Sequence, residues 1–569
     1  MRPWWEQWPG RLEWELTELE KAGFTIQEDP AAREHGRIVL NTSCDVEGTR
    51  VELKLAFPEL YPFFSFGATA PGLALPHHQN PFTRELCLLG IDSGQWSPSL
   101  SAAELLRKQL PVLLDSTRED YRPDPRRELL DAEPITAYMQ DDPPGSWVAV
   151  GDWSLPPAPT SGTLTIGVDH AWPFRGAVLE VRGTLGGVIA RAEPGLVELY
   201  RTQRIQGRWQ RLDRRPESLR PLDLLRMLTE RDPRLATPQW RQPFRDFHID
   251  IVGGVFPDEL RVGEQSDNWF FVARRTETRE GGKLWSMRAY LLRPGRESRA
   301  DFAARVPELC AMGEKAIAVV GLGSLGSTAA LEFARAGARR LHLADRDQLE
   351  MGNTVRWALG REYVGLSKAY ALGRYLRKNY PLTEVKEFWI NLGSPIWDPR
   401  APSTNIILDS ILEGVDLVLD ASAQVSMSHV LSTLCWERKI PHVWVTTTPG
   451  AWGGIVGRAM PALTDGCWLC TKFRLRDETI QAPAVGPDDG VQPAGCLTAT
   501  FTGAAMDIHP IACAAVRLAV ATLSRGVAGG YPDSAWDIGV VNLRTPEGHA
   551  VPPTWTTYQA FRHPDCGHA

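Results

Sequence analysis

The chain has 569 residues, a formal net charge of −7 at pH 7 and nine cysteines. This length provides for about three or four domains of ordinary size, which excludes a small fold held together by disulfides. Lys and Arg are scattered without a dense basic tract, and the odd number of cysteines has no repeating framework, so we expect no nucleic-acid partner and reduced thiols.

No segment of the sequence predicts a signal peptide or a membrane span. The first 24 residues lack a continuous apolar stretch, and the longest apolar helix candidate, Ile511 to Leu523, contains Arg517. We therefore expect a cytoplasmic protein without a membrane partner.

The N-terminal part begins with a predicted helix and two predicted strands. The spacing of apolar residues is helical over Trp4 to Ala22, and strand patterns follow at Arg37 to Leu40 and Arg50 to Phe57. Five short motifs come next, in this order: Phe57-Pro58, Tyr61-Pro62, His78-Gln79-Asn80, Cys87 and Trp96-Ser97-Pro98. Together they resemble the core of a ubiquitin-conjugating enzyme, which implies an α+β domain over residues 1–145.

The resemblance implies that Cys87 carries an acyl group as a thioester. Asn80 would stabilise the oxyanion when an amine attacks, or it would only hold the loop. Gln79 stands where that family has proline, so the loop geometry is left open. The competing interpretation is a degenerate fold in which Cys87 is a buried apolar side chain.

The middle of the chain is predicted to be a mixed, strand-rich linker domain over residues 146–300. Proline-rich segments at 141–145 and 155–159 mark a boundary, and short apolar runs then alternate with glycine turns. Its polar residues at strand edges suit structural roles better than catalytic ones: Asp169, His170, His248 and Asp250. The pattern leaves open whether this domain is a spacer or a docking surface for the activated protein.

The pattern over residues 315–368 predicts a nucleotide-binding unit. A buried strand, Ala316 to Val320, leads into Gly321, Gly323 and Gly326 and then a helix that ends near Gly337. Glycines allow close approach of backbone to phosphate, and the start of the helix offers unpaired N–H groups. A second strand from Arg340 ends at Asp345, where an acidic residue usually binds a ribose hydroxyl.

Polar residues that follow the glycine motif distinguish this unit from a generic dinucleotide fold. They are Asp345, Asp347, Glu350, Asn353, Arg356 and Lys368, and Gly365 precedes the last of these by three positions. Cations beside a triphosphate suit attack at phosphorus, because they offset charge on the departing pyrophosphate. The order D-x-D, N-x-x-R, G-x-x-K resembles the adenylating domain of ubiquitin-activating enzymes and of their ThiF/MoeB-type bacterial relatives, which adenylate the C-terminal glycine of sulfur-carrier proteins.

That resemblance assigns the ATP site residue by residue. The nucleotide would be bound by Gly321, Gly323, Gly326, Asp345, Asp347, Asn353, Arg356 and Lys368, and the last two would also be catalytic. Later strands are predicted at Glu384 to Ile390, Val415 to Leu419 and Pro441 to Thr447. Asp420 follows the second of these and by resemblance would bind Mg²⁺, whereas Asp409 and Asp416 are expected to be solvated.

Six of the other cysteines have predicted roles. Cys467 and Cys470 form a Cys-x-x-Cys pair, and Cys566 lies where related bacterial activating proteins have a further ligand, so a Zn²⁺ site is expected with His568, or otherwise His563, as fourth ligand. Surface thiols are the alternative. Cys496, in a glycine-flanked loop, matches the thiol that takes the acyl group from the adenylate. Cys435 and Cys513 are expected in the core.

The whole chain is thus predicted to be α/β and multidomain, with a doubly wound, Rossmann-like adenylating domain over residues 301–569. The order of domains resembles bacterial fusion enzymes found beside cGAS-like nucleotidyltransferases (CD-NTases) in CBASS antiphage systems. This implies adenylation of a nucleotidyltransferase C-terminus, transfer from Cys496 to Cys87, and conjugation to an amine of an acceptor protein. The alternatives are conjugation of a bacterial ubiquitin-like protein, or sulfur-carrier activation with the N-terminal domain as a docking module. Relatives imply a homodimer through the adenylating domain.

Overall fold

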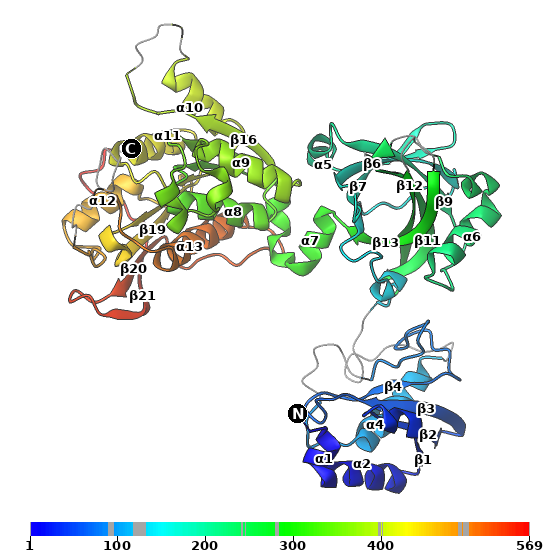
Figure 1. Cartoon of the computed structure of the whole chain (residues 1–569). Coiled ribbons are helices and arrows are strands. Elements are labelled where there is room, and N and C mark those ends of the chain that lie inside the picture. The colour runs from blue at the N-terminus through cyan, green and yellow to red at the C-terminus, as the bar shows by residue number, and fades with distance from the viewer. Residues whose placement is uncertain are drawn as a thin grey trace. The chain divides into compact units, whose positions relative to one another are not determined.

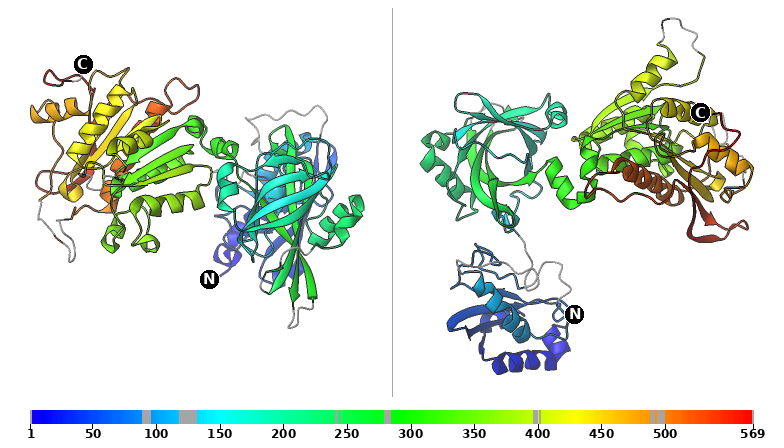
Figure 2. Two further views of the ribbon diagram at one scale, coloured as in Figure 1. Left: turned by 90° about the horizontal axis from the view of Figure 1, so that it is seen from above. Right: turned by 180° about the vertical axis from the view of Figure 1, so that it is seen from behind.

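The computed structural model describes residues 2–88, 96–117, 132–239, 243–244, 246–278, 284–395, 400, 402–487, 492 and 500–567 (Figures 1 and 2). Its internal contacts divide the chain into two compact units. The first consists of residues 1–149, 153–191 and 203–295 and contains two sheets. The second consists of residues 150–152, 192–202 and 296–569 and contains one sheet.

The N-terminal sheet is a four-stranded antiparallel sheet in the order β1-β2-β3-β4. Its strands are Thr25–Glu28, Ile38–Val46, Thr49–Phe57 and Gly67–Thr69. The helices of this part are α1 (Trp4–Gln7), α2 (Pro9–Lys21), α3 (Pro30–Glu34) and α4 (Ala102–Asp115). In β3 alternate residues are buried, so one face of the sheet packs on Leu19 of α2 and Leu106 of α4 in a single core.

The single helix predicted over Trp4 to Ala22 is wrong in one respect, because the structure has two helices there. Trp8 lies between them with φ −132° and ψ 71°, which is not helical. The following residue is Pro9, whose ring disfavours the helical conformation in the residue before it. The proline therefore ends α1 and starts α2.

The second sheet of the first unit closes into a barrel (Figure 1). Its ring order is β11-β12-β13-β5-β7-β6-β9, and β9 pairs in parallel with β11 to close it. The strands are β5 (Trp147–Val150), β6 (Ser161–His170), β7 (Arg175–Gly183), β8 (Val188–Arg191), β9 (Arg204–Arg211), β10 (Pro243–Phe244), β11 (Phe247–Arg261), β12 (Glu264–Thr278) and β13 (Leu284–Arg296). Short helices are η1 (Ile135–Tyr138), α5 (Pro194–Leu199), α6 (Pro221–Arg231) and η2 (Pro233–Ala236).

Asp250 of β11 has the structural role expected from the sequence. It is 2% exposed and accepts hydrogen bonds from Arg208, at 3.1 Å, and from Arg274. Each of these buried charges thus has a partner of opposite sign, as a charge inside the barrel requires.

The third sheet has eight strands in the order β16-β15-β14-β17-β18-β19-β20-β21. Strands β14 to β18 are parallel and the last three run antiparallel. Their bounds are β14 (Ala316–Val320), β15 (Arg340–Asp345), β16 (Glu384–Trp389), β17 (Leu417–Asp420), β18 (His442–Thr447), β19 (Gly453–Ala459), β20 (Ile538–Arg544) and β21 (Ala550–Tyr558). The strands predicted from the sequence in this region are confirmed.

Helices cover both faces of this sheet (Figure 2). Ile317 and Val319 of β14 lie in a core with α8, α9 and α13, whereas Ala318 and Val320 lie in a core with α10 and α11. The helices are α7 (Arg299–Arg305), α8 (Ser324–Arg335), α9 (Lys368–Asn379), α10 (Thr404–Leu412), α11 (Val425–Glu437), α12 (Trp468–Arg476) and α13 (Ala505–Leu523), with short turns η3 (Pro307–Glu314), η4 (Met351–Val355), η5 (Arg361–Tyr363) and η6 (Pro449–Ala451). This is the predicted Rossmann-like, doubly wound arrangement.

Helix α13 is long and apolar enough to cross a membrane by length and composition, and among the described residues it is the one helix of this kind. However, 61% of its most apolar window is buried within the protein. Ile511, Ala515 and Leu518 belong to the same core as β14. We therefore describe α13 as a core helix of the third sheet.

Candidate functional site

A glycine turn joins β14 to α8. Gly321 has φ +86°, and a Cβ atom there would lie 2.5 Å from the Cα atom of Ser422. A Cβ atom at Gly326 would lie 1.8 Å from the carbonyl oxygen of Gly321. Larger residues do not fit at either position, so the turn stays tight and the first N–H groups of α8 remain available to an anion.

A cavity of about 290 Å³ lies at this turn. Strand β14 pairs in parallel with β15 on one side and β17 on the other, which is the position where open α/β sheets bind ligands. Seven of the residues predicted to bind nucleotide line the cavity: Gly321, Gly323, Asp345, Asp347, Asn353, Arg356 and Lys368. The other two, Gly326 and Asp420, are buried.

Asp345 and Asp347 form the acidic side of the cavity. The Asp345 carboxylate accepts hydrogen bonds from the backbone N–H groups of Leu322, at 2.5 Å, and Asp347, at 2.7 Å. Burial raises the pKa of Asp345, while the Lys368 charge and these N–H groups oppose that rise. The Lys368 ammonium lies 2.9 Å from the Asp347 carboxylate. Its charged group is therefore held at the cavity by a carboxylate that is itself half exposed.

Arg356, directly after η4, is the second cation of the cavity. Its guanidinium donates a hydrogen bond to the Thr500 hydroxyl at 3.0 Å and lies 5.6 Å from the centre of the Phe501 ring. Its backbone carbonyl accepts from the Ser324 hydroxyl at 2.6 Å and contacts Nε2 of His509 at 2.9 Å. Burial lowers the pKa of Arg356, although an arginine stays charged near neutral pH.

Thr500, Phe501, Ser324 and His509 are site residues that the sequence analysis missed. Ser324 lies within the glycine motif, so its position could have been noticed. The other three lie about 150 positions after Arg356, and only folding brings them to it.

Asp420 ends β17 beside Val320 of β14, as the sequence predicted for a strand end. Its Oδ1 atom accepts from the Ser422 N–H at 2.9 Å, and its buried Oδ2 atom has no hydrogen-bond partner in the part of the chain that the structure describes. Burial lowers the pKa of the neighbouring His442, which favours the uncharged imidazole beside Asp420. An unpaired buried carboxylate oxygen fits a hard cation such as Mg²⁺.

Two acidic residues expected to be solvated differ from each other. Asp409 is exposed and pairs with Arg438. Asp416 is half-buried, and its carboxylate accepts the Ala316 N–H at 2.7 Å. That expectation is therefore wrong for Asp416, because the start of β14 has an N–H group that needs an acceptor.

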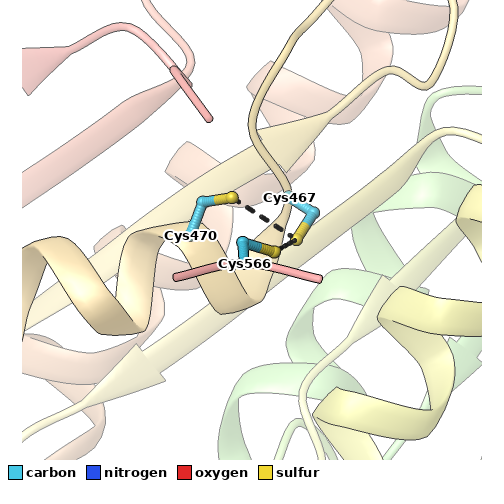
Figure 3. A group of neighbouring side chains, drawn as sticks. All are labelled: Cys467, Cys470 and Cys566. Carbon is cyan, nitrogen blue, oxygen red and sulfur yellow. Dashed lines mark hydrogen bonds between the residues drawn. The ribbon is translucent and has the colours of Figure 1, made fainter. Parts of the chain in front are cut away.

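Cys467, Cys470 and Cys566 form a buried cluster (Figure 3). The sulfur of Cys467 lies 3.8 Å from that of Cys470 and 3.7 Å from that of Cys566. Tetrahedral Zn²⁺ with Zn–S bonds of about 2.3 Å would separate its sulfurs by about 3.8 Å, so the three thiols fit this metal.

The contacts of His563 limit the choice of the fourth zinc ligand. Its Nε2 atom lies 3.0 Å from the Asp477 carboxylate, and its Nδ1 atom accepts the Asp565 N–H at 3.1 Å. Both ring nitrogens of His563 thus have other partners. His568, the first choice from the sequence, lies outside the described residues.

Cys87 is exposed on the loop that the sequence singled out. Its backbone N–H donates to the His78 carbonyl at 2.8 Å. The Asn80 side-chain oxygen accepts from the N–H groups of Phe82, at 2.9 Å, and Thr83, at 3.1 Å, so this end of the amide holds the loop. Only its Nδ2 group is of the right kind to donate to an oxyanion.

Gln79, the middle residue of the His78-Gln79-Asn80 tripeptide, is 3% exposed. Its side-chain oxygen accepts from the Leu75 N–H at 2.9 Å, and its amide nitrogen donates to the carbonyls of Ala70, at 3.1 Å, and Arg84, at 3.3 Å. These three hydrogen bonds anchor the buried Gln79 side chain to the backbone on three sides and so fix the loop.

The sequence also predicts roles for three further cysteines. Cys496 lies outside the described residues. Cys435 is buried, as expected. Cys513 is only half-buried, so its assignment to the core is wrong, because its position on α13 lies at the margin of the packed face.

Comparisons with known proteins agree with the fold of the second unit. Residues 303–544 match the ThiF family. The protein y4oA of Sinorhizobium fredii is 30% identical over 598 residues, which span 99% of this chain and 97% of y4oA. Ubiquitin-like modifier-activating enzyme 5 of Drosophila erecta is 28% identical over 164 residues, 28% of this chain and 39% of that protein.

A third relative is the adenylyltransferase and sulfurtransferase MOCS3 of Aedes aegypti. It is 34% identical over 128 residues, which are 22% of this chain and 27% of that protein. These two shorter matches indicate that this chain is an enzyme with an adenylating domain of the ubiquitin-activating type. The chain belongs to the same family as y4oA, and its residues 303–544 form a ThiF family domain.

Proposed function

We propose that the protein uses ATP and Mg²⁺ to adenylate the C-terminal carboxylate of a partner protein, and then conjugates that C-terminus to an amine. The observation that carries the proposal is the polar cavity at the glycine turn, where Asp345, Asp347, Arg356 and Lys368 converge. A nicotinamide cofactor would gain little from two cations beside its phosphates, whereas phosphoryl chemistry depends on them.

The first step forms an acyl adenylate. An oxygen of the partner's carboxylate attacks the α-phosphorus of ATP, a new O–P bond forms, and pyrophosphate leaves with the electron pair of the broken bond. Arg356 and Lys368 offset the charge that develops on pyrophosphate. Asp345 accepts hydrogen bonds from the ribose hydroxyls, and the N–H groups at the start of α8 bind phosphate oxygens.

The second step is attack by the Cys496 thiolate on the adenylate carbonyl, which releases AMP. Cys496 precedes Thr500 by four residues, and Thr500 contacts Arg356 at the cavity. This short separation supports the proposal, because four extended residues span at most about 14 Å.

The last steps involve the N-terminal part of the chain. The Cys87 thiolate attacks the Cys496 thioester and Cys496 leaves as thiolate. An acceptor amine then attacks the Cys87 thioester, loses a proton and forms an amide while Cys87 leaves. An exposed cysteine on a loop anchored by Gln79 and Asn80 favours this reading over sulfur-carrier activation, which needs no second thiol. Because both thiols belong to one chain, their effective concentration is high.

The domain order favours a cGAS-like nucleotidyltransferase as the activated partner, with a bacterial ubiquitin-like protein as the second candidate. ATP–pyrophosphate exchange with proteins encoded beside this gene tests the choice. Exchange that requires the partner's intact C-terminal residue supports adenylation of that C-terminus. If none of the candidate proteins changes the exchange rate, the proposed adenylation is contradicted.

Asp420→Ala is expected to lower pyrophosphate exchange by about 10²-fold. Mg²⁺, when bound, offsets the charge of the triphosphate, and Asp420 would hold it through the unpaired Oδ2 atom. The expected signature is also a higher Mg²⁺ concentration for half-maximal exchange. Asp409→Ala, which removes an exposed carboxylate paired with Arg438, is the matched control and should behave as wild type. An unchanged Mg²⁺ requirement in Asp420→Ala would exclude it as ligand.

The cysteine cluster is expected to hold one Zn²⁺ per chain, measured by elemental analysis. Cys470→Ser should lose this metal and lower the melting temperature by at least about 5 °C, since a structural zinc stabilises the folded chain. Cys435→Ser, which also changes a buried thiol but lies outside the cluster, should keep its zinc. Metal-free protein with wild-type stability would refute the site.

A further inference from the structure

The residues around Cys87 are not confined to the N-terminal sheet and its helices. Residues 132–139, which include η1, follow α4 in the chain and belong to the same compact unit as the N-terminal sheet and the barrel. Glu133 and Tyr138 lie in this segment. Both contact the loop that carries Cys87, and neither was singled out by the sequence.

Glu133 is held between three other residues. Its carboxylate accepts a hydrogen bond from the backbone N–H of His78, and its Oε1 atom lies 3.7 Å from Nδ1 of the His78 ring. Its Oε2 atom accepts from the Tyr138 hydroxyl at 3.3 Å, and Arg215 donates to its backbone carbonyl at 3.0 Å. The Glu133 side chain is only 12% exposed. A carboxylate placed in this way restrains whichever groups donate to it.

The restraint on His78 passes directly to Cys87. The His78 N–H is bound by Glu133, and the His78 carbonyl accepts the N–H of Cys87 at 2.8 Å. His78 has φ +60°, a left-handed conformation that is unfavourable for a residue with a side chain and persists where the surroundings hold it. Glu133 is one of the groups that hold it.

The barrel anchors the other end of this arrangement. The Ile135 N–H donates to the buried carboxylate of Asp258 at 2.8 Å, and His77 lies 3.7 Å from the Glu259 carboxylate. Phe82 of the Cys87 loop packs on the apolar core that Ile135 shares with the barrel strands. The loop therefore rests on the rim of the barrel through apolar and polar contacts.

Tyr138 links the same residues electrostatically. Burial raises its pKa most, and the negative charges of Glu133 and of the Cys87 thiolate raise it further. The charges of Glu133 and Cys87 therefore both act on the Tyr138 phenol, which also donates a hydrogen bond to Glu133.

We propose that Glu133 is a positioning residue of the Cys87 site, and that the segment 132–139 and the barrel rim are structural parts of that site. The inference rests on the proposed role of Cys87 as an acyl carrier. It gives the barrel a role beyond that of a spacer, because the loop geometry at the thiol depends on it.

The test uses the full-length protein without ATP or a partner. Hydrogen exchange of the His78 and Cys87 amides reports the loop, and the rate of Cys87 alkylation by iodoacetamide at pH 7, measured by mass spectrometry, reports the charge near the thiol. Glu133→Ala should speed exchange of the His78 amide about tenfold, since it loses one hydrogen bond to a charged acceptor. Glu133→Gln should leave exchange near the wild-type rate, because its amide oxygen still accepts, but should speed alkylation about threefold by removing a negative charge.

Controls separate this local effect from general damage. Glu217→Gln removes a charge from a carboxylate that is 73% exposed on the same unit and should change neither rate. The exposed thiol of Cys310 serves as an internal reference for alkylation.

A third variant tests the contact between Tyr138 and Glu133. Tyr138→Phe, which keeps the ring and removes one donor to Glu133, should speed His78 exchange by about threefold.

Wild-type exchange and alkylation rates in both Glu133 variants would overturn the positioning role. The proposed function has a separate readout, which is an ATP-dependent thioester on wild-type Cys87. Its absence would contradict the acyl-carrier role and would leave the amide exchange rates as they are, so the two failures are distinguishable.

Discussion

The Cys87→Ala enzyme is expected to accumulate the acyl group on Cys496 and to form no amide product, whereas the Cys496→Ala enzyme should form adenylate and no thioester. Each step needs the acyl donor made by the step before it. At neutral pH the oxygen and nitrogen nucleophiles of nearby side chains do not replace a thiolate. Amide formation should therefore fall below detection in both variants, with a different intermediate left in each.

A non-reducing gel of enzyme, ATP and partner shows which intermediate accumulates, and a second gel with reductant shows which adducts are thioesters. Cys310→Ala is the matched control, because Cys310 is an exposed thiol of the second unit that has no predicted chemical role. It should yield the wild-type amount of amide. Normal amide product from Cys87→Ala would mean that the N-terminal part only docks a partner, and sulfur-carrier activation would become the better reading.

Replacing either cation of the cavity should nearly abolish adenylation. Arg356→Ala and Lys368→Ala are each expected to lower pyrophosphate exchange by about 10²–10³-fold, which is the usual effect of removing one positioned charge that stabilises a transition state. Arg356→Ala should have a second effect that Lys368→Ala lacks. The Arg356 guanidinium also donates a hydrogen bond to Thr500 at 3.0 Å and contacts the ring of Phe501. Its loss should therefore slow the transfer to Cys496 as well.

Two exposed cations give matched controls for these variants. Lys378 lies on the same helix as Lys368, and Arg361 lies close to Arg356 in the sequence. The control variants are Lys378→Ala and Arg361→Ala. Both should exchange pyrophosphate at the wild-type rate with an unchanged melting temperature. If Lys368→Ala kept more than about a tenth of the wild-type rate, its charge would contribute too little for the role given to it.

Local pattern was enough to predict the centre of the adenylating domain. The apolar run Ala316–Val320, the three glycines and the acidic end of the next strand each determine a conformation over a few residues. A continuous apolar strand is stable only when both faces are covered, and the tight turn accepts only glycine, so the doubly wound fold and most of the cavity wall followed from the sequence.

Other features depended on contacts between distant parts of the chain. The approach of Thr500 and His509 to Arg356 follows from the packing of α13 and the segment before it, which local propensity does not encode. The break at Trp8, by contrast, could have been predicted from Pro9. The helical spacing of apolar residues on both sides of Trp8 predicted one helix instead.

The sequence by itself therefore determined the chemistry that is available: a glycine turn, two cations, paired acids and thiols in recognisable local patterns. The tertiary structure decided which of these groups meet, as when Cys566 reaches Cys467 across 99 positions or Glu133 reaches the His78 amide across 55. The physical reason is that period and turn type are set by neighbouring residues, whereas long-range contacts are set by strand order and by the burial that the whole core requires.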